Sequence, residues 1–157
     1  MTTLGISTNT RLLGFAVINQ GSLVDYAMHL HKQSWSPSKA TQIIAKLEPC
    51  VRRYCIKSVV LSIPYAYHQT KEWKYLTARI RKHFAAKGIS VYSEKIETLY
   101  SLSAPQQKKT KKAFMQAVAE RFPEMHYCLY KELRNKSKYY IKVFEAIAIA
   151  ALHEQIA

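Results

Sequence analysis

The beginning of the chain has the apolar pattern of three β-strands. Residues 4–7 and 14–18 are short, mostly apolar runs, and the turn residues 19–22 lead into residues 24–31. In that last segment Val, Tyr, Met and Leu alternate with a second, mostly polar set of side chains. Because successive side chains of a strand point to opposite faces of a sheet, this alternation is typical of a strand. The short connections predict an antiparallel meander.

The next segment predicts a helix followed by a buried strand. Ser36 and Pro37 supply an N-cap and a first-turn proline, and apolar residues then recur at helical spacing as far as Val51. Residues 59–63 form an almost continuous apolar run that ends at Pro64. Such a run is typical of a strand covered on both faces, as in a parallel sheet.

The rest of the chain predicts one more strand among helices. Residues 73–84 carry apolar positions three and four apart, and residues 89–92 form a fifth strand. A helix that ends near Pro123 and a last helix from Ser137 to about Gln155 complete the order.

These elements predict one α/β domain spanning residues 1–157. A chain of 157 residues is long enough for one core and short for two. The order of elements predicts a five-stranded mixed sheet with helices on both faces. Its first three strands are antiparallel, and its fourth and fifth strands are parallel to the first.

Several common kinds of site are excluded by the sequence. The four glycines lie too far apart for a dinucleotide-binding or Walker loop. The three cysteines have no C-x-x-C spacing, and the only closely spaced histidines are His29 and His31, which favours a solvated strand face over a zinc site.

The net charge of the chain indicates which class of partner to expect. The chain has 24 Lys and Arg against 10 Asp and Glu, a net charge of +14. Such an excess favours polyanions, and nucleic acid is the first candidate. Neither a signal peptide nor an apolar run of about 20 residues is present, so we expect a cytoplasmic protein without a membrane partner.

Three separate segments resemble a known family. Residues 4–18, Leu-Gly-Ile-Ser-Thr-Asn-Thr-Arg-Leu-Leu-Gly-Phe-Ala-Val-Ile, resemble the first hairpin of RuvC-type Holliday-junction resolvases in the ribonuclease H-like superfamily. There an apolar strand with Gly-Ile-Asp precedes a polar turn with Arg, a Gly and a second apolar strand. Residues 59–62 resemble the family's fourth strand, and residues 144–150 resemble its final Asp-Ala-Leu-Ala-Ile-Ala helix. The resemblance implies a ribonuclease H-like fold.

The same resemblance assigns the catalytic positions. In the family three acidic residues bind two divalent cations that activate water. Those positions are Ser7, Ser62 and Glu145 here, so two of the three are neutral hydroxyl groups. The only aspartate of the chain is Asp25, in the third predicted strand. We therefore expect an inactive or weakly active homologue.

Other acids could replace the missing ones. Glu94 and Glu97 follow the fifth strand, in a segment that resembles an Asp-Glu-Arg element of another branch of the superfamily. A site with Glu145 and Glu94 as metal ligands would take Mg²⁺ or Mn²⁺, and a cofactor is expected only in that case. The alternative is that both acids stabilise the N-terminus of a helix.

Glu145 is a notable residue because its neighbours are almost all apolar. A buried carboxylate needs a partner, and Lys142, three residues earlier, could form an ion pair with it. We predict that Glu145 faces the family's active-site position, either as a metal ligand or as part of such a pair.

Two basic clusters are the strongest positive evidence for function. They precede or open the predicted helices near Pro123 and at Ser137, and both could border Glu145. Tyr139 and Tyr140 lie among the second cluster, and aromatic rings beside cations suit contacts with bases or sugars. The candidate nucleic-acid contacts are Lys108, Lys109, Lys111, Lys112, Arg134, Lys136, Lys138 and Lys142.

Three functions remain open at this point. The first is binding of structured DNA or RNA through the phosphate backbone, without cleavage or with weak cleavage. The second is a metal-dependent, structure-specific endonuclease with an atypical site. The third is a protein-interaction module, such as a homodimer, whose charge keeps it soluble.

Overall fold

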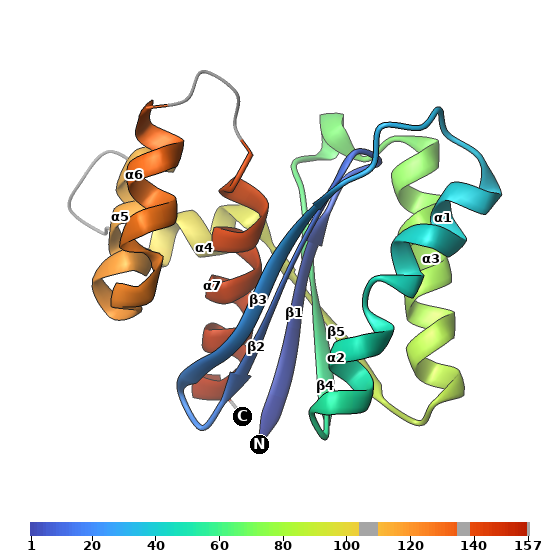
Figure 1. Ribbon diagram of the computed structural model, residues 1–157, viewed down its shortest axis with the longest axis horizontal. Helices are drawn as coiled ribbons and strands as arrows, with labels where there is room; N and C mark the ends of the chain where they lie inside the picture. The colour runs from blue at the N-terminus through green and yellow to red at the C-terminus, as the bar shows by residue number, and fades with distance from the viewer. Residues whose placement is uncertain (104–109, 135–138, 157) are drawn as a thin grey trace.

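The computed structural model describes residues 1–103, 110–134 and 139–156, which form one mixed sheet with helices on both faces (Figure 1). The strands follow the order β3-β2-β1-β4-β5 in the sheet. β1 pairs antiparallel with β2 and parallel with β4. β2 pairs antiparallel with β3, and β4 parallel with β5. The predicted sheet is confirmed. The strands are β1 Thr2–Thr8, β2 Leu12–Asn19, β3 Ser22–Leu30, β4 Ser58–Ile63 and β5 Ser90–Lys95.

The helices form a layer on each side of the sheet (Figure 1). One face is covered by α1 Pro37–Ala45, α2 Glu48–Arg53 and α3 Lys71–Ala86. On the other face α7, Ile141–Ile156, contacts β1, β2 and β4 directly. Three helices pack outside α7 and beside it: α4 Ile96–Ser103, α5 Lys111–Arg121 and α6 His126–Arg134. The chain also has two single-turn helices, η1 Ala66–His68 and η2 Pro123–Met125.

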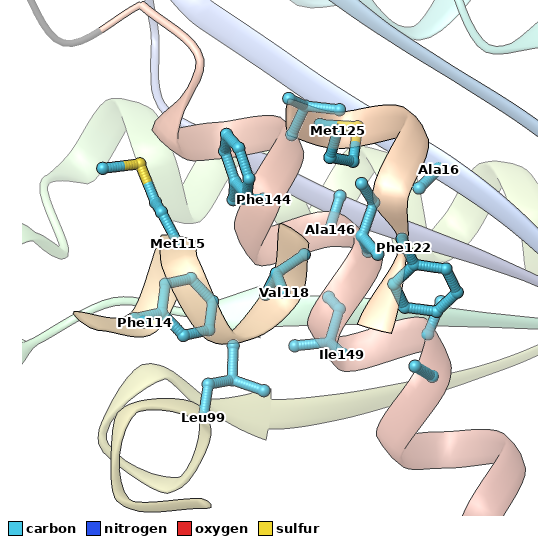
Figure 2. Packing of buried hydrophobic residues seen from close by; sticks show 14 of the residues in the cluster. Ala16, Leu99, Phe114, Met115, Val118, Phe122, Met125, Phe144, Ala146 and Ile149 are labelled. Carbon is cyan, nitrogen blue, oxygen red and sulfur yellow. The ribbon is translucent and has the colours of Figure 1, made fainter. Parts of the chain in front are cut away.

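A separate apolar core lies on each face of the sheet. Leu4 and Ile6 of β1 point into the core beneath α1 to α3. The opposite core joins the sheet to α4, α5 and α7, and Figure 2 shows Leu99, Phe114 and Phe144 within it. Burial of apolar side chains on both faces of the sheet accounts for the continuous apolar run at residues 59–63.

Local capping explains where several helices begin and end. The Ser36 hydroxyl accepts a hydrogen bond from the Lys39 amide at 3.1 Å, with Pro37 in the first turn, as predicted. The Thr70 and Thr110 hydroxyls cap α3 and α5 in the same way. After α3, Gly88 takes a φ of 73°, the left-handed conformation that glycine adopts at low cost.

Two glycines allow α7 to lie directly on the sheet. A Cβ atom on Gly5 would lie 2.1 Å from the Ala146 carbonyl oxygen, and one on Gly14 would lie 2.4 Å from the Lys142 carbonyl carbon. The clashing atoms belong to the backbone, so turning a side chain could not relieve these contacts. The glycines of β1 and β2 therefore set the position of the first half of α7, which carries Glu145.

The start of the last helix differs from the prediction. It begins at Ile141 instead of Ser137, and residues 135–138 lie outside the described residues. The buried carboxylate of Glu132 accepts hydrogen bonds from the Tyr139 amide at 3.2 Å and the Tyr140 amide at 2.8 Å. These amides are paired with a side chain on α6, and the helix starts just after them.

Three other helices were not predicted individually. The single helix predicted as far as Val51 is divided into α1 and α2, so α2 is an additional helix. α4 follows β5 without an intervening turn residue and reaches Ser103. α6 lies between Pro123 and the second basic cluster. No helix among the described residues is both long and apolar enough to cross a bilayer.

Candidate functional site

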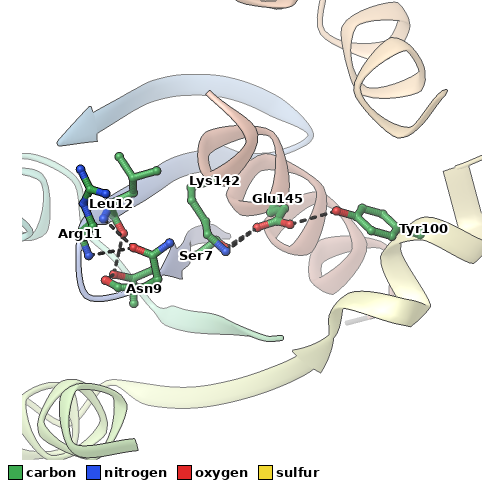
Figure 3. Close-up of polar contacts among 8 residues, drawn as sticks. Ser7, Asn9, Arg11, Leu12, Tyr100, Lys142 and Glu145 are labelled. Atoms are coloured by element: carbon green, nitrogen blue, oxygen red, sulfur yellow. Dashed lines mark hydrogen bonds and ion pairs between the residues drawn. The ribbon is translucent and has the colours of Figure 1, made fainter. Parts of the chain in front are cut away.

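Glu145 lies at the centre of a buried polar cluster between α7 and β1 (Figure 3). Its Oε1 atom accepts a hydrogen bond from the Ser7 hydroxyl at 2.8 Å and from the Lys142 ammonium at 3.2 Å. Its Oε2 atom accepts a hydrogen bond from the Tyr100 hydroxyl at 3.2 Å. Glu145 therefore faces Ser7, as predicted, and of the two alternatives left open for it the structure contains the ion pair with Lys142.

Each partner of Glu145 comes from a different part of the fold. Ser7 points toward α7 because Ile6, its neighbour in β1, points into the opposite core. Lys142 is three residues before Glu145, so both lie on one side of α7. Tyr100 comes from α4, and burial, together with the negative charge of Glu145, raises the pKa of its phenol. Tyr100 therefore remains a hydrogen-bond donor at neutral pH.

Ser62 occupies the corresponding place on the next strand. Ile6 of β1 pairs with Leu61 of β4, and each precedes one of the two serines by one residue. Ser7 and Ser62 thus lie beside each other near the ends of adjacent parallel strands, and both are buried. The fold brings together the three positions that the resemblance assigns.

Glu94 lies in register with Ser62 but lines another hollow. It is paired with Ser62 across β4 and β5, and one of its oxygens accepts a hydrogen bond from the Lys95 amide. The hollow that Glu94 lines also includes Tyr92 and His153, whereas Glu145 lines the pocket described next. Glu97 is in the first turn of α4, where an acid stabilises the helix.

A pocket of about 500 Å³ opens beside Glu145. Its charged lining residues are Arg11, Lys111, Lys142 and Glu145, so positive charge predominates among the described residues that line it. Aromatic side chains occupy another part of the wall, from the residue before η1, from η1 itself and from the start of α3. They are Tyr65, Tyr67, His68 and Trp73.

The turn between β1 and β2 presents Arg11 to this pocket. The Asn9 side-chain oxygen accepts hydrogen bonds from the Arg11 amide at 2.8 Å and the Leu12 amide at 2.7 Å (Figure 3). The Thr8 hydroxyl donates to the Leu12 carbonyl group at 3.0 Å. These contacts fix the turn, while the Arg11 side chain is exposed. In the sequence Arg11 is recognisable only as the arginine of the family's hairpin pattern, and no signal there indicates that it lines a pocket.

Tyr67 is a highly exposed aromatic residue of the pocket. It is 76% exposed, and its ring stacks on Tyr65 with centroids 5.7 Å apart and planes 9° apart. The His68 ring also contacts the Tyr67 ring, with the two centroids 4.3 Å apart. An exposed ring supported from beneath is suited to stacking on a nucleobase.

Comparison with solved structures identifies the fold. RuvC of Thermus thermophilus, solved in complex with a Holliday junction substrate, aligns with a TM-score of 0.73 at 16% identity, over 98% of this chain and 93% of that chain. The chain has a RuvC-type, ribonuclease H-like fold. A Fowlpox virus resolvase, solved with Holliday junction DNA, aligns at 0.58 with 9% identity, over 99% of this chain and 98% of that one. The yeast mitochondrial Holliday junction resolvase Ydc2 aligns at 0.56 with 10% identity, over 99% and 84% respectively.

At these low identities the structural alignments show the fold alone. No protein-family model and no curated protein sequence matches the chain. The predicted fold class and the predicted resemblance to RuvC-type resolvases are confirmed at the level of structure.

The residues present do not fit the two divalent cations that the family resemblance implies for a RuvC-type site. Mg²⁺ and Mn²⁺ need several anionic oxygen ligands. Ser7 and Ser62 offer neutral hydroxyl groups, and Lys142 places a positive charge 3.2 Å from Glu145. Within residues 1–103, 110–134 and 139–156, no three His, Cys, Asp or Glu side chains are grouped to hold a metal ion.

Four of the eight predicted basic contacts lie among the described residues of this RuvC-type fold. Lys111 and Lys142 line the pocket with Glu145, as expected for clusters that border it. Lys112 is exposed in the first turn of α5, and Arg134 ends α6, with its guanidinium 5.2 Å from the centre of the Tyr130 ring. The other four candidates, Lys108, Lys109, Lys136 and Lys138, lie outside the described residues.

Proposed function

We propose that this protein binds structured nucleic acid through the phosphate backbone and does not cleave it, or cleaves it only weakly. One observation carries this proposal: the carboxylate at the family's active-site position is held by three protein donors inside a basic, aromatic pocket. A carboxylate used in this way lacks the acidic partners that a two-metal nuclease requires. The surrounding cations and rings are those that bind phosphates and bases.

Branched DNA is the first candidate ligand. The RuvC of Thermus thermophilus and the Fowlpox virus resolvase, which share this fold, were solved with Holliday junction DNA. In this chain Arg11, Lys111 and Tyr67 border the same pocket from three separate elements. Phosphate contacts from Arg11 and Lys111 would orient the nucleic acid, and Tyr67 would stack on an unpaired base near the branch point.

The test compares two double variants in binding to labelled four-way junction, duplex DNA and duplex RNA. Arg11→Gln with Lys111→Gln removes two pocket cations, whereas Lys46→Gln with Lys82→Gln removes two exposed cations elsewhere on the surface. For the pocket variant, we expect weaker binding. The slope of the logarithm of the binding constant against the logarithm of the salt concentration should be less steep by about 1.8, or about 0.9 per lost phosphate contact. Equal slopes for the two variants would refute this proposal.

Tyr67→Ala is expected to weaken junction binding by about tenfold. Loss of one base-stacking ring costs roughly 1–3 kcal/mol of binding free energy. Tyr67→Phe keeps the ring and serves as the control, so its affinity should match that of the unmodified protein. The dissociation constants can be measured by fluorescence anisotropy, and equal affinities for the two variants would exclude stacking by Tyr67.

A further inference from the structure

Lys142 holds a position between the buried carboxylate and the open pocket. Its ammonium lies 3.2 Å from Glu145 Oε1, and the two side chains are 17% and 4% exposed. Both residues line the pocket that also contains Arg11 and Lys111. The positive charge of Lys142 is therefore on the accessible side of the pair, and the negative charge is on the buried side.

The positions of the Lys142 and Glu145 charges affect the binding of a phosphate that enters the pocket. Ser7 and Tyr100 satisfy Glu145 with neutral donors, so they leave its negative charge uncompensated. A phosphate diester beside an uncompensated carboxylate would be repelled. In a two-metal nuclease the divalent cations remove that repulsion. Here Lys142 supplies the compensating charge from the protein itself.

The geometry of an ammonium also allows a second contact. A lysine ammonium has three N–H donors, and Glu145 accepts one of them. The Lys142 side chain is partly exposed and lines the pocket, so its ammonium can direct another N–H toward an anion there. An ammonium contact with a phosphate oxygen is a charge-assisted hydrogen bond, among the stronger hydrogen bonds of proteins.

We propose that Lys142 takes the place of the divalent cations as a resident cation: it neutralises Glu145 and binds a backbone phosphate, so that nucleic acid is held at this pocket without metal. The phosphate contact rests on the proposed function, whereas the neutralisation of Glu145 does not. The two parts can therefore fail separately.

The neutralisation is tested on the protein alone by thermal unfolding. Lys142→Gln should lower the unfolding midpoint because it leaves Glu145 charged and buried. Lys142→Arg should recover most of the loss, and so should Lys142→Gln combined with Glu145→Gln, which removes both charges. A Lys142→Gln variant as stable as the unmodified protein, or a double variant no more stable than Lys142→Gln alone, would overturn this part.

Metal replacement is tested with the same measurement on the unmodified protein. Its midpoint should be equal in a chelating buffer and in millimolar Mn²⁺ at constant ionic strength, because Lys142 already occupies the place of the cation. A clear rise with Mn²⁺ would show a metal site and overturn the proposal. This test uses the unmodified protein, so its result does not depend on whether any variant folds.

The phosphate contact is tested with labelled four-way junction DNA at constant ionic strength. Binding in chelator should be at least as tight as in Mg²⁺, and Lys142→Arg should retain it. Lys142→Gln should reduce the salt slope by about 0.9, whereas the surface control Lys82→Gln should not. If the junction binds only with Mg²⁺, the resident-cation proposal fails while the proposed function stands. If neither the junction nor duplex DNA or RNA binds under any condition, the proposed function fails, and with it the phosphate contact.

Discussion

Gly14→Ala is expected to lower the free energy of unfolding by about 3 kcal/mol or more, near the upper end for overpacked sites. The added methyl group would lie 2.4 Å from the Lys142 carbonyl carbon and 2.6 Å from its oxygen, so α7 must move off the sheet. For a chain of this length, such a loss lowers the unfolding midpoint by roughly 6–12 °C. Circular dichroism during thermal and urea unfolding measures both quantities.

Gly88→Ala is the control for this prediction. A Cβ atom at Gly88 meets no atom within 4 Å, although the residue has a φ of 73°. That conformation alone costs a non-glycine residue roughly 1 kcal/mol, so the control should be affected much less. Equal losses for the two variants would mean that α7 does not lie against β2 as closely as described.

Junction binding by the unmodified protein is expected to weaken roughly 500-fold when salt increases fourfold, if about five phosphates are neutralised at 0.9 each. The physical reason is that each phosphate bound by Lys or Arg releases condensed counterions, and their release is less favourable at high salt. The chain has a net charge of +14, and three of its cations line the pocket. Titrations at several salt concentrations give the slope directly.

A shallow salt dependence would contradict this electrostatic account. Binding that survives high salt would instead favour the interaction-module alternative, in which a protein partner is held by apolar contacts. β3 and α6 carry exposed apolar or aromatic side chains, including Tyr26, Tyr127 and Tyr130. Size-exclusion chromatography at high salt distinguishes that outcome, because an apolar self-association would persist.

The sheet could be predicted from the sequence because its signals are local. Alternation, turn residues and the run ended by Pro64 each depend on a few neighbouring positions. Two helices lacked such signals. Ile96 starts α4 directly after Lys95 ends β5, and no glycine, proline or capping residue marks the change. On α6 the exposed Tyr127 and Tyr130 obscure the contrast between an apolar and a polar face.

The centre of the site could be predicted in part. Glu145 and Lys142 are three residues apart on one helix, so their pairing follows from helical spacing, and Ser7 follows from the family resemblance. Tyr100 is 45 residues from Glu145 in the chain and reaches it only through the packing of α4. Glu94 was one of two alternatives for a replacement acid, and it lines another hollow than the one that Glu145 lines. Contacts of this kind depend on tertiary packing and leave no local pattern.

Binding without cleavage is tested most directly by one experiment on labelled four-way junction DNA. The purified protein is incubated with the junction in Mn²⁺ or Mg²⁺, and each sample is divided between a native gel and a denaturing gel. We predict a retained complex whose strands keep their full length. Metal-dependent shortening of the strands that disappears with Glu145→Ala would contradict it, because the site would then be an active nuclease centre.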